Sequence, residues 1–184
     1  MSKITLCSAA LAGLLFIPNL VLSEDAMTQF SLSDPNRWTY FSDQVMGGVS
    51  EGQATFETEG QHPVLRLTGD VSTANRGGFV QVRTDLDSAL PASAVGLELK
   101  VRGNDQTYFV HLRTGGTVLP WQYYQAPFEA TQTWQVVRIP FTAFRPSGGI
   151  LRKTPKPDAI KSVAIVAYGR DHSADVSVRS VGIY

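Results

Sequence analysis

Apolar and polar residues alternate in many short runs of this chain, and this period of two constrains its fold more than any other feature. In residues 94–102 (AVGLELKVR), the leucine and valine side chains would point to one side of a strand and the charged ones to the other. The same alternation occurs in residues 64–71, 78–83, 107–113, 133–139, 160–168 and 174–184. No stretch after residue 23 sustains a helical period. The pattern predicts an all-β chain of roughly eight or more antiparallel strands.

Composition indicates how these strands pack. The chain has 184 residues, of which 43% are hydrophobic and 17% charged, and no shift in composition marks a second domain. Half-buried strands must stack on their apolar faces, so we expect a single β-sandwich of jelly-roll type over residues 24–184. The folded part of the chain should begin near Phe30 and Leu32. Sixteen basic and sixteen acidic residues cancel, which argues against a nucleic-acid partner.

The first 23 residues differ from the rest. Lys3 gives a positive start, residues 4–17 are mostly apolar, and Ser23 closes a short run before Glu24. This is the pattern of a secretory signal peptide, and the interruption at Pro18 disfavours a membrane anchor. We therefore expect an exported protein, in a bacterium a periplasmic one.

Catalytic and metal-binding patterns are missing from the sequence. The only cysteine, Cys7, lies in the predicted leader, and His62, His111 and His172 are too far apart for an HxH or HExxH pair. Ser50 has no nucleophile elbow around it, and no dinucleotide-binding glycine motif opens a helix. We expect no catalytic residue, no metal ion and no cofactor. A hydrolase using Asp43 with another carboxylate is a weaker alternative.

Two segments join polar side chains to a glycine pair: residues 42–50 (SDQVMGGVS) and residues 75–84 (NRGGFVQVRT). Glycine pairs form tight turns, but they also let a ligand approach the backbone closely. The short side chains beside them could bind a ligand or brace the loops through hydrogen bonds. The candidate binding residues here are Asp43, Gly47, Gly48, Ser50, Asn75, Gly77 and Gly78.

Arginines recur on the polar side of the central strands. Arg83, Arg102 and Arg113 fall there, together with Gln81, Lys100 and His111. If these strands are neighbours, one sheet face carries guanidinium groups that could hold carboxylates, peptide carbonyls or sugar hydroxyls. The alternative is a solvated face with acidic counter-charges.

Aromatic residues form another candidate surface. Trp121, Tyr123 and Tyr124 could stack on sugars or anchor a protein interface, and one of the two adjacent tyrosines should point outward. Trp134 is expected in the core. Residues 146–157 (PSGGILRKTPKP) should form an exposed loop. Its basic cluster could bind an anionic partner, but we expect an ordinary solvated loop.

Several motifs recur in the order of one known family. They comprise Asp43, Gly47, Gly48 and Ser50, then Asn75, Gly77, Gly78, Phe79 and Arg83, and later Gly96, Arg102, Arg113, Phe128 and Trp134. Residues 38–184 thereby resemble the NADH:ubiquinone oxidoreductase intermediate-associated protein 30 family, although residues 102–106 (RGNDQ) depart from the R-G-D-G typical of it. The resemblance implies a jelly roll of the galactose-binding-domain-like kind. It also implies a role in assembling a protein complex, which in mitochondrial relatives is respiratory complex I.

These observations favour a binding or assembly module without enzymatic activity. The expected partner is a protein or a segment of a membrane-protein complex, held by the glycine-paired loops and the three arginines. The alternative is a carbohydrate-binding module that uses Trp121, Tyr123 and Tyr124.

Overall fold

The computed structural model describes residues 29–184, so the predicted leader (1–23) and Cys7 lie outside the described residues. This part of the chain forms twelve strands. They are β1 (Gln29–Phe30), β2 (Trp38–Ser42), β3 (Glu51–Glu59), β4 (His62–Val71), β5 (Phe79–Asp85), β6 (Gly96–Gly103), β7 (Gln106–Thr114), β8 (Tyr124–Ala130), β9 (Gln135–Pro140), β10 (Arg145–Pro146), β11 (Ile160–Tyr168) and β12 (His172–Ile183).

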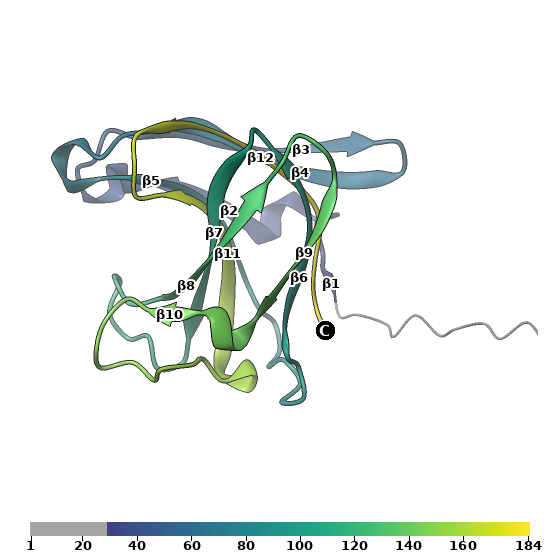
Figure 1. Ribbon diagram of the computed structural model, residues 1–184, viewed down its shortest axis with the longest axis vertical. Coiled ribbons are helices and arrows are strands. Elements are labelled where there is room, and N and C mark those ends of the chain that lie inside the picture. Colours follow the sequence, from purple (N-terminus) through teal and green to yellow (C-terminus); the bar gives the residue numbers. More distant parts are fainter. Residues whose placement is uncertain (1–28) are drawn as a thin grey trace, which may run out of the picture.

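The strands form two antiparallel sheets that face each other across the core (Figure 1). Sheet A has the order β3-β4-β12-β6-β9, with β1 paired to β12, and sheet B has the order β10-β8-β7-β11-β5-β2. The predicted jelly-roll sandwich is confirmed. Consecutive strands cross between the sheets: β5 lies in sheet B, β6 in sheet A and β7 again in sheet B.

The alternation of the sequence matches the burial of the side chains. Leu97, Leu99 and Val101 of β6 are completely buried in the core. On β11 the inward residues belong to the core, while the opposite face carries small side chains such as Ser162 and Ala164. Because these small side chains are themselves almost fully covered, larger neighbours must enclose that outer face of sheet B.

Five short 3-10 helices, of three or four residues each, complete the described chain: η1 (Pro35–Arg37), η2 (Asp43–Met46), η3 (Ala74–Arg76), η4 (Phe141–Ala143) and η5 (Pro157–Ala159). Within residues 29–184, none of these helices has the length and apolar character needed to cross a membrane. Within the described residues, Phe30 lies in β1 and Leu32 is buried in the core.

Candidate functional site

The carboxylate of Asp43 is buried and ties the two glycine-paired loops together. It accepts hydrogen bonds from the backbone amide of Ser50 (2.9 Å) and from the Ser50 hydroxyl. It also accepts bonds from the backbone amides of Gly78 and Phe79, across the other loop. Burial opposes ionisation of this carboxyl, but the hydrogen bonds outweigh that effect and hold the pKa of Asp43 below its usual value.

The glycines make room for this carboxylate. A Cβ atom on Gly48 or on Gly77 would lie 2.3 Å from carboxylate atoms of Asp43, a distance no real structure allows. Gly47 and Asn75 have positive φ angles of 90° and 55°, which form the tight turns beside the carboxylate. Asp43 and Ser50 are thus placed inside the protein as a brace, and they offer no surface to a ligand.

The three predicted arginines do not share one face. Arg83 on β5 and Arg113 on β7 lie on opposite sides of β11, in register with Ala164 and Ser162. Arg102 lies on β6, which belongs to the other sheet, so the prediction of a common face is wrong for this residue. Lys100 lies on the same strand, so it too is absent from the face that carries Arg83 and Arg113.

Arg102 has a structural setting in sheet A. It pairs with Glu59 at 2.6 Å, and its guanidinium lies 4.6 Å from the centre of the Trp134 ring. Arg179 of β12 pairs with the same glutamate and lies 4.3 Å from the same ring. Trp134 is therefore half-buried and lies against two cations at the protein surface. The prediction that it packs in the core is wrong.

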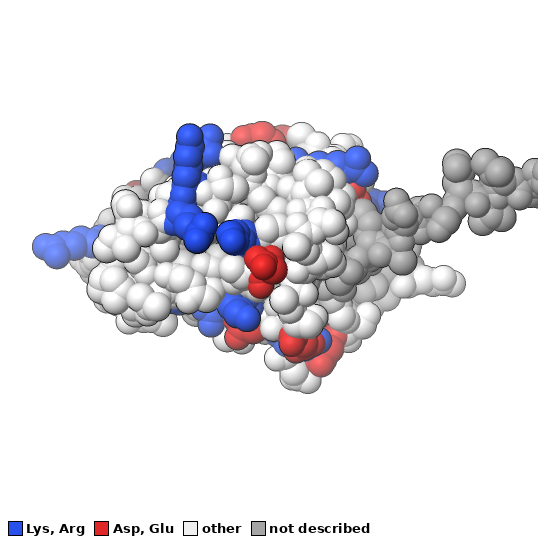
Figure 2. All heavy atoms as spheres, turned by 90° about the horizontal axis from the view of Figure 1, so that it is seen from below, with Lys and Arg blue, Asp and Glu red and all other residues white. Residues whose placement is uncertain are grey.

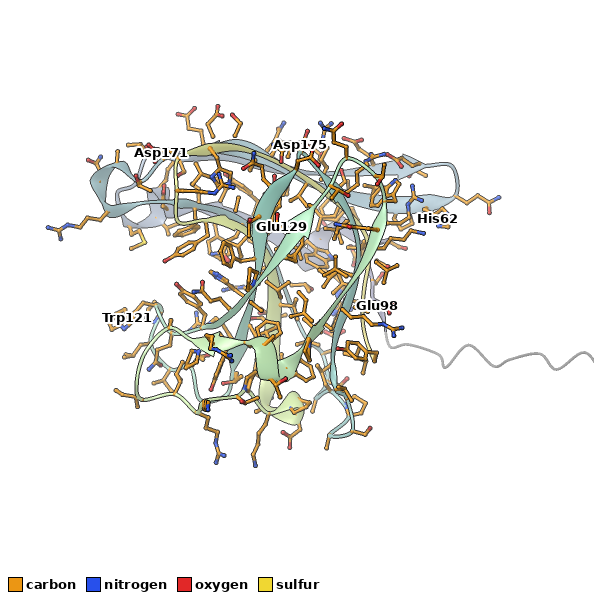
Figure 3. All side chains as sticks on the ribbon, in the orientation of Figure 1. His62, Glu98, Trp121, Glu129, Asp171 and Asp175 are labelled. Carbon is orange, nitrogen blue, oxygen red and sulfur yellow. The ribbon has the colours of Figure 1, made fainter. Side chains whose placement is uncertain are left out.

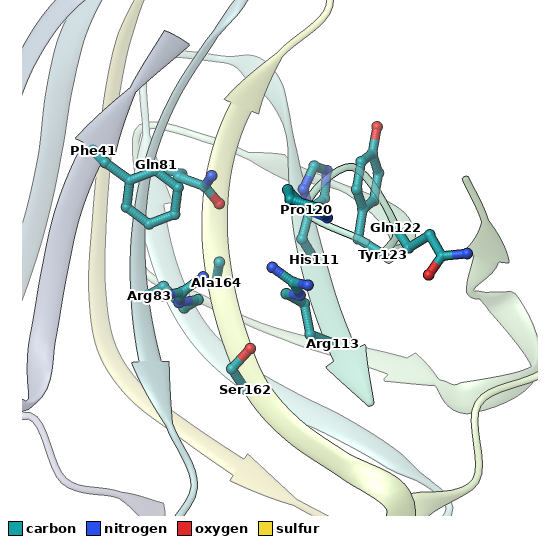
Figure 4. Close-up of a pocket in the computed structure, with 10 residues that line it drawn as sticks. All are labelled: Phe41, Gln81, Arg83, His111, Arg113, Pro120, Gln122, Tyr123, Ser162 and Ala164. Atoms are coloured by element: carbon teal, nitrogen blue, oxygen red, sulfur yellow. The ribbon is translucent and has the colours of Figure 1, made fainter. Parts of the chain in front are cut away.

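Sheet B carries a small open pocket of about 70 Å³ above β11, which we call the β11 pocket (Figure 4). Its floor is formed by Ser162 and Ala164. Figure 4 shows Arg83 and Arg113 reaching toward this floor from the two flanking strands. The pocket is lined by Phe41, Gln81, Arg83, His111, Arg113, Pro120, Gln122, Tyr123, Ser162 and Ala164.

Both arginines retain donors for a ligand. The guanidinium of Arg83 lies 3.8 Å from the exposed Asp85 carboxylate and 5.1 Å from the centre of the Phe41 ring. One terminal nitrogen of Arg113 donates to the carbonyl oxygens of Thr117 (3.0 Å) and Leu119 (3.1 Å). Since a guanidinium has five N–H donors, these contacts leave some donors of each arginine available to a ligand.

One wall of the pocket is a stacked aromatic pair. The rings of His111 and Tyr123 lie 4.2 Å apart at an angle of 10°, and the Tyr123 hydroxyl donates to that of Tyr168 at 3.3 Å. Burial lowers the pKa of His111 to about 3, against a smaller opposing effect of Gln125. Burial likewise raises the pKa of Tyr123. Both rings are therefore uncharged at neutral pH, and the two arginines supply the charge of the pocket.

The other predicted aromatic residues lie elsewhere. Tyr124 is buried in the core, so it is Tyr123 that lines the pocket. Trp121 is 67% exposed on the loop between β7 and β8, beside two residues that line the pocket but not in its lining (Figure 3).

Sequence reasoning missed Phe41, Ser162 and Ala164. The sequence of β11 (IKSVAIVAY) carried a signal, because its small residues Ser162 and Ala164 fall on the same side of the strand. Small side chains on that side leave a depression between the larger side chains of the neighbouring strands. Within residues 29–184, no group of three or more His, Cys, Asp or Glu side chains could hold a metal ion.

Solved structures with a similar fold include carbohydrate-binding modules. The family 11 module from Clostridium thermocellum, in complex with a β-1,3-1,4-mixed-linked tetrasaccharide, superposes with a TM-score of 0.68 at 13% identity, covering 84% of this chain and 93% of that one. The family 11 module of cellulase Lic26A-Cel5E from the same organism gives a TM-score of 0.66 at 14% identity, covering 86% and 95%. At such identities the likeness concerns the fold alone. Among curated proteins no match was found.

Sequence comparison identifies the family. A family profile described as Complex I intermediate-associated protein 30 (CIA30) matches residues 27–176, which is most of the chain and includes both glycine-paired loops, β5 to β11 and the β11 pocket. The resemblance read from the motifs is thereby confirmed, and the chain belongs to the complex I intermediate-associated protein 30 family.

Proposed function

We propose that this protein is a non-catalytic binding module that holds one component of a protein complex during assembly, with the β11 pocket as a central contact. The pocket is the observation that carries the proposal. It combines the guanidinium groups of two arginines, an uncharged aromatic wall, and a floor of small side chains on a rigid sheet.

The size and chemistry of the pocket favour a small part of a large partner. Small-molecule sites usually measure roughly 300–1,000 Å³, and the β11 pocket is far below that range at about 70 Å³. That volume suits one planar polar group, such as a side-chain carboxylate or a peptide carbonyl. Guanidinium groups hold such groups by paired, charge-assisted hydrogen bonds. The flanking rings of Phe41 and Tyr123 would pack on the apolar part of the same partner.

The pocket supports binding rather than catalysis. Its histidine is uncharged at neutral pH, with a pKa of about 3, and is stacked on a tyrosine, so it is a poor general base. Asp43, the carboxylate of the first glycine-paired segment, is buried and already accepts four hydrogen bonds from the protein. Neither group is free to move a proton to or from a bound molecule.

Family membership supports the assembly role, since the family is described by its association with complex I intermediates. The signal-peptide pattern of residues 1–23 supports export, and we propose that the protein acts outside the cytoplasm. The complex that it helps to assemble would then differ from one whose intermediates lie on the cytoplasmic side of the membrane.

Site-specific photo-crosslinking in the cells that make the protein tests this proposal. A photoreactive residue in place of Gln81, which lines the pocket, should capture a discrete partner. The same residue in place of Gln53, which is exposed on β3 of sheet A, is the matched control. Equal capture at the two positions, or none at either, would contradict the assignment of this face.

A pair of arginine variants adds a second readout. Arg83→Gln should reduce capture about tenfold or more, because loss of a charge-assisted fork costs roughly 1.5–3 kcal/mol. Arg102→Gln, which alters an arginine of sheet A, should leave capture unchanged. Thermal melts of both variants verify that they remain folded.

A glycan is the second candidate, and the half-buried Tyr123 ring, which lines the pocket, favours it because sugar faces pack on aromatic rings. The family 11 module that shares the fold was solved with a mixed-linked tetrasaccharide, which makes that sugar a suitable probe. Calorimetric titration would decide: binding that Tyr123→Ala abolishes supports the glycan, whereas no heat with this sugar or on a glycan array supports the protein partner.

A further inference from the structure

The loops at one end of sheet B expose apolar side chains at their tips. Val118 and Trp121, on the β7–β8 loop, are 78% and 67% exposed, and Ile150, on the β10–β11 loop, is 90% exposed. Large apolar residues at such exposure are unfavourable in water, so a group of them marks a surface that meets another phase or molecule.

Hydrogen bonds hold these two loops together. The Ser147 hydroxyl donates to the carbonyl oxygen of Trp121 at 3.0 Å, and the Ser147 amide donates to that of Tyr123 at 2.9 Å. Ile150 also lines a shallow hollow together with Gly116 of the first loop. The apolar tips therefore form one end of the molecule, which we call the loop end.

Basic residues surround these tips. Residues 147–161 contain four basic side chains and one acidic one, whereas the loop 115–123 has no charged residue at all. Within the part of the chain that the structure describes, these four cations form no ion pair. They are Arg152, Lys153, Lys156 and Lys161, all exposed.

Figure 2 shows the molecule from below, the side on which the β10–β11 loop lies in Figure 1. Uncharged atoms cover most of this surface, basic side chains rise from its left part, and acidic side chains lie near its centre and lower edge. The chain as a whole is neutral, with sixteen basic and sixteen acidic residues. The positive charge of the loop end is therefore a local arrangement.

We propose that the loop end docks on an anionic lipid surface, with Trp121, Val118 and Ile150 entering the interface and the basic residues meeting lipid phosphates. Tryptophan prefers the headgroup level, and each nearby Lys or Arg adds attraction to anionic lipid. The apolar side chains stand together at the tips of two joined loops, an arrangement that suits insertion into the fluid interface of a bilayer.

Docking would also orient the β11 pocket. Pro120 and Gln122 line the pocket, and Trp121 lies between them on the same loop. The pocket would consequently stand close to the membrane, within reach of a partner embedded in it. This inference goes beyond the proposed function, because lipid binding is measured without any protein partner.

Tryptophan fluorescence with vesicles tests the proposal. Trp38 is buried and Trp134 is half-buried between cations, so Trp121 is the tryptophan best placed to report lipid contact. With phosphatidylcholine vesicles that contain phosphatidylglycerol, the emission should shift to the blue, and brominated lipid should quench it. Trp121→Phe should remove both effects. The leader contains no tryptophan, so its insertion into lipid gives no emission change of its own.

Co-sedimentation with the same vesicles gives the affinities. Replacing Arg152 and Lys153 by glutamine should weaken binding about fivefold for each lost cation, and Val118→Ser with Ile150→Ser should weaken it further. Val136→Ser, a 58% exposed valine on β9 of sheet A, is the matched control and should bind like the wild type. An unshifted Trp121 emission, or binding that the loop variants leave unchanged, would overturn the proposal.

Discussion

Asp43 accepts two hydrogen bonds from Ser50, one from its backbone amide and one from its hydroxyl. With the amides of Gly78 and Phe79, this carboxylate joins two loops that are far apart in the sequence. Asp43→Asn replaces one acceptor oxygen by a donor that faces other donors. We expect the free energy of unfolding to fall by about 2–4 kcal/mol. Urea unfolding measures it. The control is Asp171→Asn, an exposed carboxylate that accepts bonds from Thr73 and should matter less.

The pH dependence of stability provides a second test of the same carboxylate. Because the folded pKa of Asp43 lies below its unfolded value, its contribution is complete above the unfolded pKa of about 3.9 and disappears as the pH falls through the folded pKa. The stability difference between wild type and Asp43→Asn should therefore be constant near neutral pH and shrink below about pH 4. A difference that stays constant down to pH 2.5 would contradict the role given to the ionised form.

The strands that sequence alone predicts are those with one face in the core. Residues 94–102 overlap β6, because burial of Leu97, Leu99 and Val101 on one face of that strand imposes the period of two. The pattern does not predict β2, β3 or β8. In β3 no residue is fully buried, and in β8, where burial does alternate, Pro127 disfavours a strand assignment from sequence.

The site shows what alternation cannot determine. It assigns Arg83, Arg102 and Arg113 correctly to polar sides of their strands, but it does not say which sheet a strand joins. Since the chain crosses between sheets at β6, Arg102 is separated from the other two. The glycine pairs were visible in the sequence, but their partner, the carboxylate that fills the space a Cβ would need, became evident only in three dimensions.

Gly47 and Gly48 are adjacent and should respond differently to alanine. Gly47 has a φ of 90° with open space around it, so Gly47→Ala should cost only the backbone penalty of about 1–2 kcal/mol. In Gly48→Ala the new methyl group would overlap the Asp43 carboxylate, and we expect a larger loss. Denaturant midpoints of the two variants make the comparison. Equal losses would mean that the carboxylate can move aside at little cost.

His111 should make the protein less stable in mild acid. Burial lowers its folded pKa to about 3, whereas the unfolded chain takes up the proton near pH 6.5. Stability should therefore fall as the pH decreases from about 6.5 toward 3, with a slope of up to about 1.4 kcal/mol per pH unit. His111→Phe keeps a ring against Tyr123 and should remove most of this slope. The half-buried His172, whose pKa burial also lowers, contributes to the remainder, and Asp43 adds to it below about pH 4. An unchanged slope in His111→Phe would assign the proton uptake to other groups.

Trp134 and Trp121 distinguish structural from surface roles of the aromatic residues. Trp134 lies within 5 Å of two guanidinium groups, at 4.6 Å and 4.3 Å from its ring centre, and both arginines are paired with Glu59. Each cation–π contact is worth about 0.5–1 kcal/mol, so Trp134→Ala should lower the free energy of unfolding by roughly 1–2 kcal/mol or more. Trp121 is exposed, and Trp121→Ala should change it by less than about 0.5 kcal/mol. Urea unfolding of the two variants at the same pH measures both effects. Equal losses would show that the Arg102–Trp134–Arg179 cluster adds nothing to the stability of sheet A.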